Sequence, residues 1–202
     1  MKVGPKYKIC RRLGSDMFEK CQSPKYVISE AKKTKVQKGK RPKPLTDYGK
    51  QMKNKQKVRL SYYISEKQFS NYVKSAMSKK GVSSTQKLYE DLESRLDNVV
   101  YRLGLATSRA LARQMVSHGH IDVNGKRITI PSFRTVIGNK VSIRERSKNS
   151  ALFKDVTEKI TTSSIPSWIK FDLKSMEATI TNKPAGAQTN LDLNSVIEFY
   201  SR

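Results

Sequence analysis

Apolar residues recur every three or four positions through the middle of the chain, which predicts a series of helices. Ser65 and Gln68 have the spacing of a capping box, so we expect a helix from there to about Lys79, ended by Gly81. The next predicted helix contains the clearest apolar stripe of the sequence and is closed by Gly104. Its buried face is formed by Leu88, Leu92, Leu96, Val99 and Leu103.

A short third helix is expected next, with Thr107 or Ser108 as its N-cap and Gly119 at its end. The apolar period then changes from three or four to two. Asn124-Gly125, the strongest two-residue hairpin signal, separates the apolar residues at 121 and 123 from those at 128 and 130. Further strands are expected at 141–143, 168–171 and 196–200, and a further helix at 152–160. The sequence therefore predicts an α+β protein.

The first third of the chain lacks such periodicity and carries most of the charge. The 202 residues include 41 Lys+Arg and 17 Asp+Glu, a formal net charge of +24. Between Met1 and Leu60 there are 19 basic and 4 acidic residues. We expect residues 1–45 to form an extended basic segment that becomes ordered against its partner; a flexible solubilising tail is the alternative.

This charge favours a polyanionic partner, because each Lys or Arg that neutralises a phosphate also releases a condensed counterion. We expect no membrane attachment, since no apolar run approaches the roughly 18 residues of a spanning helix and no signal peptide is evident. Two cysteines, Cys10 and Cys21, are too few for a disulfide framework. We expect them to be ordinary thiols in a reducing compartment.

Basic residues gather between Leu92 and Arg146. Arg109 and Arg113 share one face of the third helix, and like charges at this spacing repel unless an anion such as a phosphate backbone compensates. The N-terminus of that helix at Ser108 is itself suited to anions. The remaining members of this predicted basic edge are Arg95, Arg102, His118, Gly119, His120, Asn124, Lys126 and Arg127.

Structural alternatives exist for several of these residues. Arg95 and Arg102 can instead pair locally with Glu93 or Asp97, and the two histidines can cap the helix end. No paired carboxylates in an apolar setting, Cys–His pair or phosphate-cradling glycine loop suggests catalysis, so we expect no enzyme. The acids Glu90, Asp91 and Glu93 are expected on an exposed helix face.

Three segments resemble one family. The sequence LDNVVYRLGLATSRALARQMVSHGHIDVNGKRI, Leu96 to Ile128, is similar to the RNA-binding module of the bacterial and organellar small-subunit ribosomal protein four. LTDYGKQMKNKQKVRLSYYISEKQFSNY, Leu45 to Tyr72, resembles the first domain of that family, and the closing VIEFYSR resembles its C-terminus. The resemblance covers nearly the whole chain.

The resemblance implies a mostly helical first domain, formed by residues 46–91 with about 165–202, into which the module domain 92–164 is inserted. It implies early binding to ribosomal RNA of the five-prime domain, close to the channel through which messenger RNA enters. Neighbouring small-subunit proteins and, transiently, messenger RNA are the other expected partners. The location is the bacterial cytoplasm, or an organelle if the gene is organellar. The alternative is an RNA chaperone or RNA-modification factor that uses the same module.

By position, the resemblance implies RNA contacts within the module at Arg95, Arg102, Ser108, Arg109, Arg113, His118, Gly119, Asn124, Gly125 and Arg127. Outside the module we expect contacts from Arg11, Arg12, Lys57 and Arg59, and contacts close to entering messenger RNA from Lys40, Arg41 and Lys43.

One departure from the family concerns metal. Many relatives hold a structural zinc with four cysteines, and the corresponding positions here are Tyr7, Cys10, Cys21 and Tyr26. Two thiolates cannot complete a tetrahedral zinc site. We therefore expect neither zinc nor any other cofactor, and a contact between the two tyrosines.

Overall fold

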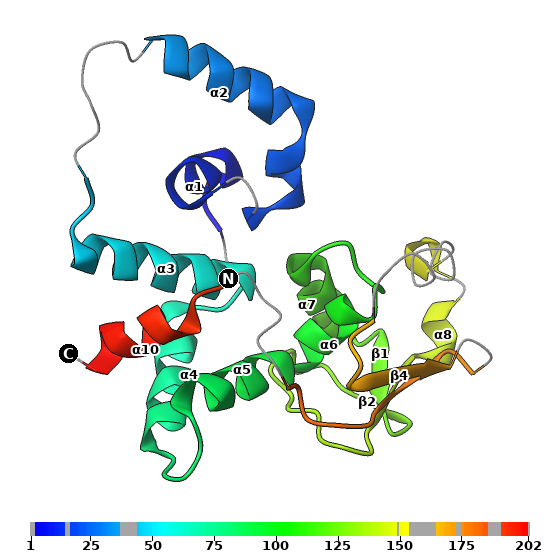
Figure 1. Ribbon diagram of the computed structural model, residues 1–202. Helices are drawn as coiled ribbons and strands as arrows, with labels where there is room; N and C mark the ends of the chain where they lie inside the picture. The colour runs from blue at the N-terminus through cyan, green and yellow to red at the C-terminus, as the bar shows by residue number, and fades with distance from the viewer. Residues whose placement is uncertain are drawn as a thin grey trace. The chain divides into compact units, whose positions relative to one another are not determined.

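The computed structural model describes residues 3–14, 17–36, 44–148, 150–153, 165–172, 175–185 and 191–201 (Figure 1). The chain divides into two compact units. Unit 1 consists of Met1–Lys80 and Gln188–Arg202, and unit 2 consists of Gly81–Ala187. Because the C-terminus returns to unit 1, unit 2 is an insertion in the sequence of unit 1.

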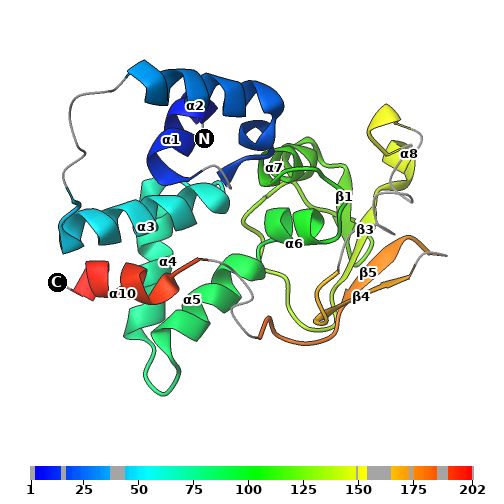
Figure 2. The same ribbon diagram turned by 45° about the horizontal axis from the view of Figure 1, so that its top comes forward.

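Unit 1 is helical in its described part. It contains α1 (Lys6–Leu13), the 3-10 turn η2 (Glu19–Gln22), α2 (Pro24–Val36), α3 (Asp47–Ser61), α4 (Glu66–Ser78) and α10 (Leu193–Ser201). As predicted, the Ser65 hydroxyl caps α4 by accepting from the backbone N–H of Gln68 at 3.4 Å. Helix α10 packs on α3 and α4, as Figure 2 shows.

A polar cluster around Glu66 joins these three helices. The Glu66 carboxylate pairs with Lys55 at 2.6 Å and Arg59 at 3.0 Å, and accepts from the Tyr200 hydroxyl at 3.2 Å. Burial, followed by the charge of Glu66, raises the pKa of Tyr200 to about 12. The Tyr200 phenol therefore remains a neutral hydrogen-bond donor that ties α10 to the start of α4.

Two predictions for unit 1 are wrong. The described part of the N-terminal segment, residues 3–14 and 17–36, forms helices rather than an extended chain, because Cys10, Leu13, Cys21 and Tyr26 close into a small core. The end of the chain is a helix, not a strand. Buried Leu193 and Val196 lie three residues apart, which suits a helix packed on α3.

In its described part, unit 2 combines helices with an antiparallel sheet. The first helices are α5 (Ser84–Glu93), α6 (Leu96–Arg102) and α7 (Arg109–His118). The strands are β1 (Ile121–Val123), β2 (Lys126–Arg127), β3 (Lys140–Ile143), β4 (Ile169–Asp172) and β5 (Glu177–Ile180), in the spatial order β2-β1-β3-β5-β4. The short helix α8 (Glu145–Lys148) and the 3-10 turn η3 (Ala151–Phe153) follow β3.

The local signals of this unit are largely confirmed. The Ser108 hydroxyl accepts from the Leu111 N–H at 3.3 Å and caps α7, which ends at left-handed Gly119. Asn124 and Gly125 both have positive φ, at 51° and 74°, as a tight hairpin turn requires. Strand β2 ends before the apolar residues expected to continue it, and Ile130 is exposed. Of the helix predicted at 152–160, residues 154–160 lie outside the described part of the chain.

The long helix predicted through the Leu stripe is in fact two helices. All five stripe residues are fully buried, but the helix is interrupted at Ser94 and Arg95. A neighbouring segment holds this break: the N–H of Leu96 donates to the carbonyl of Phe133 at 2.9 Å, and that of Thr135 to the carbonyl of Ser94 at 2.8 Å. These hydrogen bonds come from tertiary structure, so periodicity alone does not reveal them.

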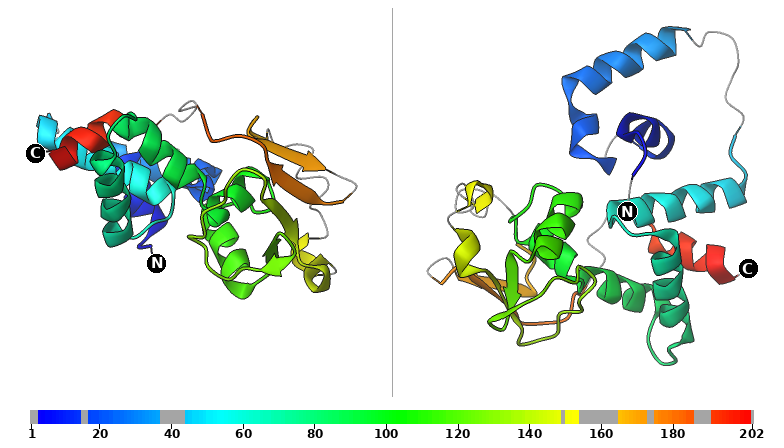
Figure 3. Two further views of the ribbon diagram at one scale, coloured as in Figure 1. Left: turned by 90° about the horizontal axis from the view of Figure 1, so that it is seen from below. Right: turned by 180° about the vertical axis from the view of Figure 1, so that it is seen from behind.

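The domain boundaries also differ from those predicted. The β4–β5 hairpin, drawn in orange in Figure 3, belongs to the sheet of unit 2, because Lys140 of β3 is in register with Thr179 of β5. Only the C-terminal segment from residue 188 joins unit 1, instead of about 165–202. Helix α5 lies in unit 2, where its Gln86 side chain donates to the carbonyl of Pro184 at 3.1 Å.

Candidate RNA-binding surface

A buried carboxylate organises the first group of basic side chains. Glu93, at the end of α5, is fully buried and accepts two hydrogen bonds from the Arg102 guanidinium, at 2.9 and 2.8 Å. It also accepts from the Asn98 amide at 2.9 Å. Asn98 and Arg102 are one turn apart on α6 and so share a face. The bidentate pair fixes the plane of the Arg102 guanidinium, whose side chain is still 25% exposed.

The same network reaches the first residue of α7. The Arg109 Nε donates to the Asn98 Oδ1 at 2.7 Å, and its guanidinium carbon lies 4.4 Å from the centre of the Tyr101 ring. A cation over an aromatic face is attracted by the ring quadrupole. Arg109 is therefore held between an amide and a ring, at the positive end of a helix with no acidic residue in its first turn.

Asp97 organises the second pair of arginines. It accepts from Arg95 at 3.0 and 2.6 Å, and its Oδ2 lies 3.5 Å from a guanidinium nitrogen of Arg113. Arg95 is 1% exposed, while the Arg113 side chain is 27% exposed. The guanidinium of Arg95 is sealed against Asp97 inside the fold, which matches the structural alternative of a local pair, and its contact with RNA stays a prediction.

We define Arg102, Arg109 and Arg113 as the arginine cluster. Glu93 pairs with Arg102 and is linked to Arg109 through Asn98, and Asp97 pairs with Arg113. Counting Arg95, four guanidinium groups surround two carboxylates, and this leaves a formal excess of two positive charges. The carboxylates neutralise the buried part of the network, while parts of the Arg102 and Arg113 side chains still face solvent. A surface of fixed, partly exposed guanidinium groups is suited to phosphate oxygens, which accept from guanidinium in the same bidentate way as carboxylates.

The opposite end of α7 carries a second group of predicted residues. The Arg127 Nη2 donates to the carbonyl of His118 at 3.2 Å, across left-handed Gly119. A Cβ at Gly119 would lie 2.1 Å from the Arg127 Nε, so glycine allows this close approach. His118, Lys126 and Arg127 are exposed, whereas the His120 Nδ1 lies 3.0 Å from the Ser147 hydroxyl.

The Asn124-Gly125 hairpin turn is held by a hydrogen bond to the neighbouring strand β3. The Asn124 Oδ1 accepts from the Lys140 N–H at 2.8 Å, and both Asn124 and Gly125 are exposed. The structure therefore places exposed cations at the tip of the hairpin and the arginine cluster around α6 and the first half of α7.

The predicted contacts in unit 1 have mixed surroundings. Arg11 pairs with Glu30 and donates to the Ser29 hydroxyl at 3.2 Å, whereas Arg12 is exposed. Arg59 belongs to the Glu66 cluster, and Lys57 is half-buried on the same helix. Lys40, Arg41 and Lys43 lie outside the described residues.

Sequence reasoning named Glu93 and Asp97 as alternative partners of Arg95 and Arg102 but did not predict that both acids are buried. Glu93 and Asp91 were expected on an exposed face, but Glu93 is fully buried and Asp91 is 9% exposed. Burial also raises the pKa of Tyr89, with a further contribution from Glu93, so this phenol next to the network stays neutral. The available signal was Glu93, Asp97 and the arginines at helical spacing within a strongly apolar stripe.

The cysteine positions do not fit a tetrahedral metal site. Cys10 and Cys21 form a disulfide rather than the expected thiols, and tyrosines, Tyr7 and Tyr26, stand at the other two positions that the resemblance assigns to zinc ligands. Burial raises the pKa of Tyr26, which disfavours the phenolate that a metal would require. The described residues contain no group of three or more His, Cys, Asp or Glu side chains that could hold a metal ion. That the chain uses no cofactor stays a prediction.

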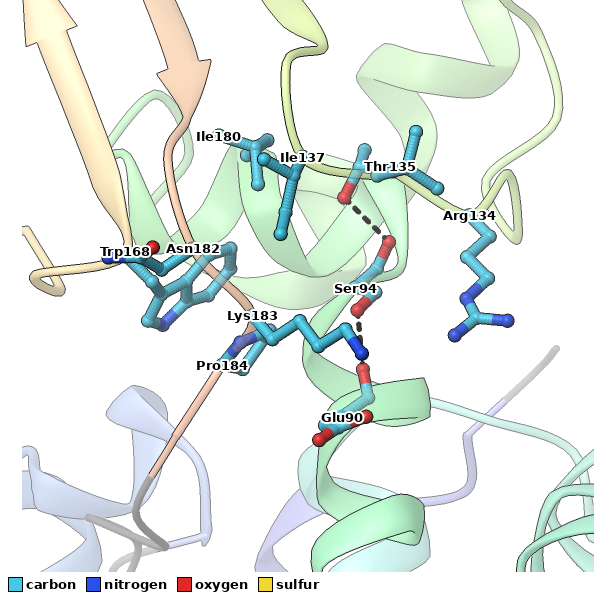
Figure 4. A pocket seen from close by; sticks show the side chains of 11 residues that line it. Glu90, Ser94, Arg134, Thr135, Ile137, Trp168, Ile180, Asn182, Lys183 and Pro184 are labelled. Atoms are coloured by element: carbon cyan, nitrogen blue, oxygen red, sulfur yellow. Dashed lines mark hydrogen bonds between the residues drawn. The ribbon is translucent and has the colours of Figure 1, made fainter. Parts of the chain in front are cut away.

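Unit 2 also contains a small pocket of about 190 Å³, shown in Figure 4. Trp168, Ile137 and Ile180 line it together with the charged residues Glu90, Arg134 and Lys183. It is smaller than the roughly 300–1,000 Å³ of typical small-molecule sites, and most of its lining is apolar. No described helix of the chain is long and apolar enough to cross a membrane.

Comparison with known proteins identifies the family of the chain. Residues 94–139, which include the arginine cluster, match the S4 domain, and residues 2–93 match the Ribosomal protein S4/S9 N-terminal domain. The chain is 42% identical over 204 residues to the small ribosomal subunit protein uS4 of Chromobacterium violaceum, with 99% of this chain and 98% of the relative covered.

The corresponding proteins of Thermus thermophilus and Acetivibrio thermocellus are 41% and 39% identical, each with the same coverage of 99% and 98%. These relatives are ribosomal proteins rather than enzymes, which confirms that the chain is not an enzyme. Two matching domains and full-length similarity at this level show that the chain belongs to the uS4 family of small ribosomal subunit proteins.

Proposed function

We propose that this chain is a structural component of the small ribosomal subunit that holds ribosomal RNA through phosphate contacts. The observation that carries the proposal is the arginine cluster, Arg102, Arg109 and Arg113, oriented by buried Glu93 and Asp97. The exposed cations Lys126 and Arg127 and the positive end of α7 extend the anion-binding capacity of unit 2. Specificity then comes from the shape of a folded RNA junction rather than from base sequence.

The test is the salt dependence of binding. The full chain is titrated with a folded fragment of small-subunit ribosomal RNA at several salt concentrations. Removing two phosphate contacts with Arg109→Ala plus Arg113→Ala lowers the slope of log affinity against log salt by about one to two units. The matched control is Lys170→Ala plus Lys183→Ala, which removes the same charge from two exposed lysines outside the cluster. Equal slopes for the two double variants would place the main contacts away from the cluster.

Binding to RNA early in assembly is part of the proposal. A protein that binds only the folded form of an RNA junction stabilises that form by mass action, and this favours later assembly steps in the five-prime domain. Reconstitution of that domain, followed by hydroxyl-radical protection, measures this directly. If the protein is added last and assembly proceeds equally well, an early role is refuted.

We also propose a position beside the channel through which messenger RNA enters, with neighbouring small-subunit proteins as further partners. Lys40, Arg41 and Lys43 supply positive charge for a passing RNA strand. Crosslinking from each of these three positions to messenger RNA on assembled subunits tests this placement. The compartment is the bacterial cytoplasm, or an organelle in the case of an organellar gene.

The alternative is a free RNA chaperone or RNA-modification factor, which the basic N-terminal segment also permits. Sedimentation separates the two functions. A structural component remains at one copy per small subunit after a salt wash, whereas a transient factor is lost.

A further inference from the structure

The N-terminal part of unit 1 closes around Tyr7, Cys10, Cys21 and Tyr26, the four positions at which the family resemblance implies a structural zinc in many relatives. Helix α1 supplies Tyr7 and Cys10, η2 supplies Cys21, and α2 supplies Tyr26. Cys10 and Cys21 are 2% and 1% exposed, and Tyr26 is 5% exposed. The four side chains are thus gathered in one place, although their chemistry does not fit a metal.

Two contacts join these positions in pairs. Cys10 and Cys21 are linked by a disulfide with their Cα atoms 6.5 Å apart, within the usual range for such a bond. The rings of Tyr7 and Tyr26 have their centres 5.3 Å apart and are tilted by 45°. The expected contact between the tyrosines is therefore confirmed, and together the pairs connect α1 to both η2 and α2.

The surrounding packing makes this arrangement a small core of its own. Leu13, Met17 and Leu60 are buried against the cysteines and Tyr26. Leu60 belongs to α3, so the core anchors the N-terminal helices to the rest of unit 1. Without a cross-link, a core of so few apolar side chains contributes little against the conformational entropy of the segment.

We propose that the Cys10–Cys21 disulfide and the Tyr7–Tyr26 contact form a metal-independent clasp, in which the disulfide replaces the zinc of related proteins and makes the order of residues 6–36 sensitive to thiol redox state. The inference does not depend on the proposed RNA-binding function. It corrects the expectation that both cysteines are ordinary thiols.

The redox step is an exchange with a low-molecular-weight disulfide. The two thiols of Cys10 and Cys21 lose two electrons and two protons in forming their S–S bond, and the external disulfide gains them and leaves as two thiols. A hollow of about 600 Å³ is lined by both cysteines, Tyr26 and Glu30, so this is the side from which such a reagent would approach the buried disulfide. A dithiol reductant reverses the step.

The expected size of the effect follows from the sequence separation of 11 residues. Closing a loop of this length removes enough entropy from the open chain to favour the ordered form by about 100-fold. Tryptic cleavage at basic residues between 6 and 36 tracks the population of the open form when opening and closing are fast. Reduction should therefore accelerate this cleavage by up to about 100-fold.

The experiment compares cleavage of the full chain in three conditions: with a low-molecular-weight disulfide, with a dithiol reductant, and with a metal chelator. We expect slow cleavage and no titratable thiol in the first, fast cleavage in the second, and no effect of the chelator in either redox state. Two titratable thiols under the oxidising condition would overturn the disulfide. Chelator-dependent cleavage would overturn the metal-independent clasp.

Two variants complete the test. Cys10→Ser plus Cys21→Ser should be cleaved at the rate of the reduced wild type, with no response to the reductant. Tyr7→Cys plus Tyr26→Cys restores four thiols and should gain zinc-dependent, chelator-sensitive protection under reducing conditions. Protection of the reduced wild-type chain by zinc, equal to that of this variant, would refute the proposal.

Discussion

Replacing Glu93 by Gln tests whether a buried carboxylate organises the RNA-binding surface. The substitution keeps the shape of the side chain but removes the charge that accepts from Arg102 and Asn98. The new amide group also places N–H donors next to the Arg102 guanidinium and the Asn98 amide, which are themselves donors. Loss of one partner from a buried ion pair costs about 3–5 kcal/mol. Because the Arg102 side chain is 25% exposed, water solvates part of its charge, and we expect a loss of about 2–3 kcal/mol.

Urea unfolding followed by the fluorescence of Trp168 measures this loss. Trp168 is the single tryptophan of the chain, lies in unit 2 and is 5% exposed, so its emission reports unfolding of that unit. With a urea dependence of about 1–3 kcal/mol per M, the midpoint should fall by about 0.7–3 M. The control is Glu145→Gln, whose side chain is 84% exposed and which should leave the midpoint unchanged.

The RNA affinity of Glu93→Gln shows whether binding depends on the orientation of the arginine cluster or only on the net charge of the chain. The variant has one more unit of positive charge, so non-specific attraction alone would strengthen binding. We expect weaker binding under conditions in which unit 2 is still folded, because Arg102 and Asn98 lose their anchor, and Asn98 in turn positions Arg109. An unchanged urea midpoint, or tighter RNA binding at every salt concentration, would refute the reasoning.

Two further predictions concern buried groups. Arg95→Ala leaves the Asp97 carboxylate without its bidentate partner and should destabilise unit 2 by about 3–5 kcal/mol in the Trp168 assay. The salt slope of RNA binding, measured on the folded fraction, should not change. A fall of one unit in that slope would show that Arg95 contacts RNA. For Tyr200, the folded-state pKa of about 12 exceeds the ordinary value of 10.0, so its contribution to stability is complete below pH 10 and is lost as the pH rises toward 12. Tyr200→Phe should flatten this alkaline loss in thermal melts followed by circular dichroism, and an equally steep loss in the variant would assign it to other groups.

Several elements could be predicted because their causes are local. The capping residues Ser65 and Ser108, the left-handed Gly119 and the Asn124-Gly125 turn act over two to four residues, and the structure has each where the sequence predicts it. The buried Leu stripe also follows from helical periodicity.

Other elements depend on partners distant in sequence. The break between α5 and α6 is held by hydrogen bonds from the segment around Phe133, and the β4–β5 hairpin joins unit 2 through its pairing with β3. The apolar residues near the C-terminus fit both a strand and a helix over so short a length, and packing on α3 decides for the helix.

The sequence by itself determined the charge, the kinds of side chain available for RNA and the incompatibility of the cysteine set with a tetrahedral zinc site. Which arginines face outward was decided by tertiary structure. Arg95 and Arg113 share the same carboxylate of Asp97, yet one is sealed in the core and the other is more than a quarter exposed. The physical reason is that burial depends on how helices and strands pack together, and an ion pair between a buried acid and an arginine forms only once that packing exists.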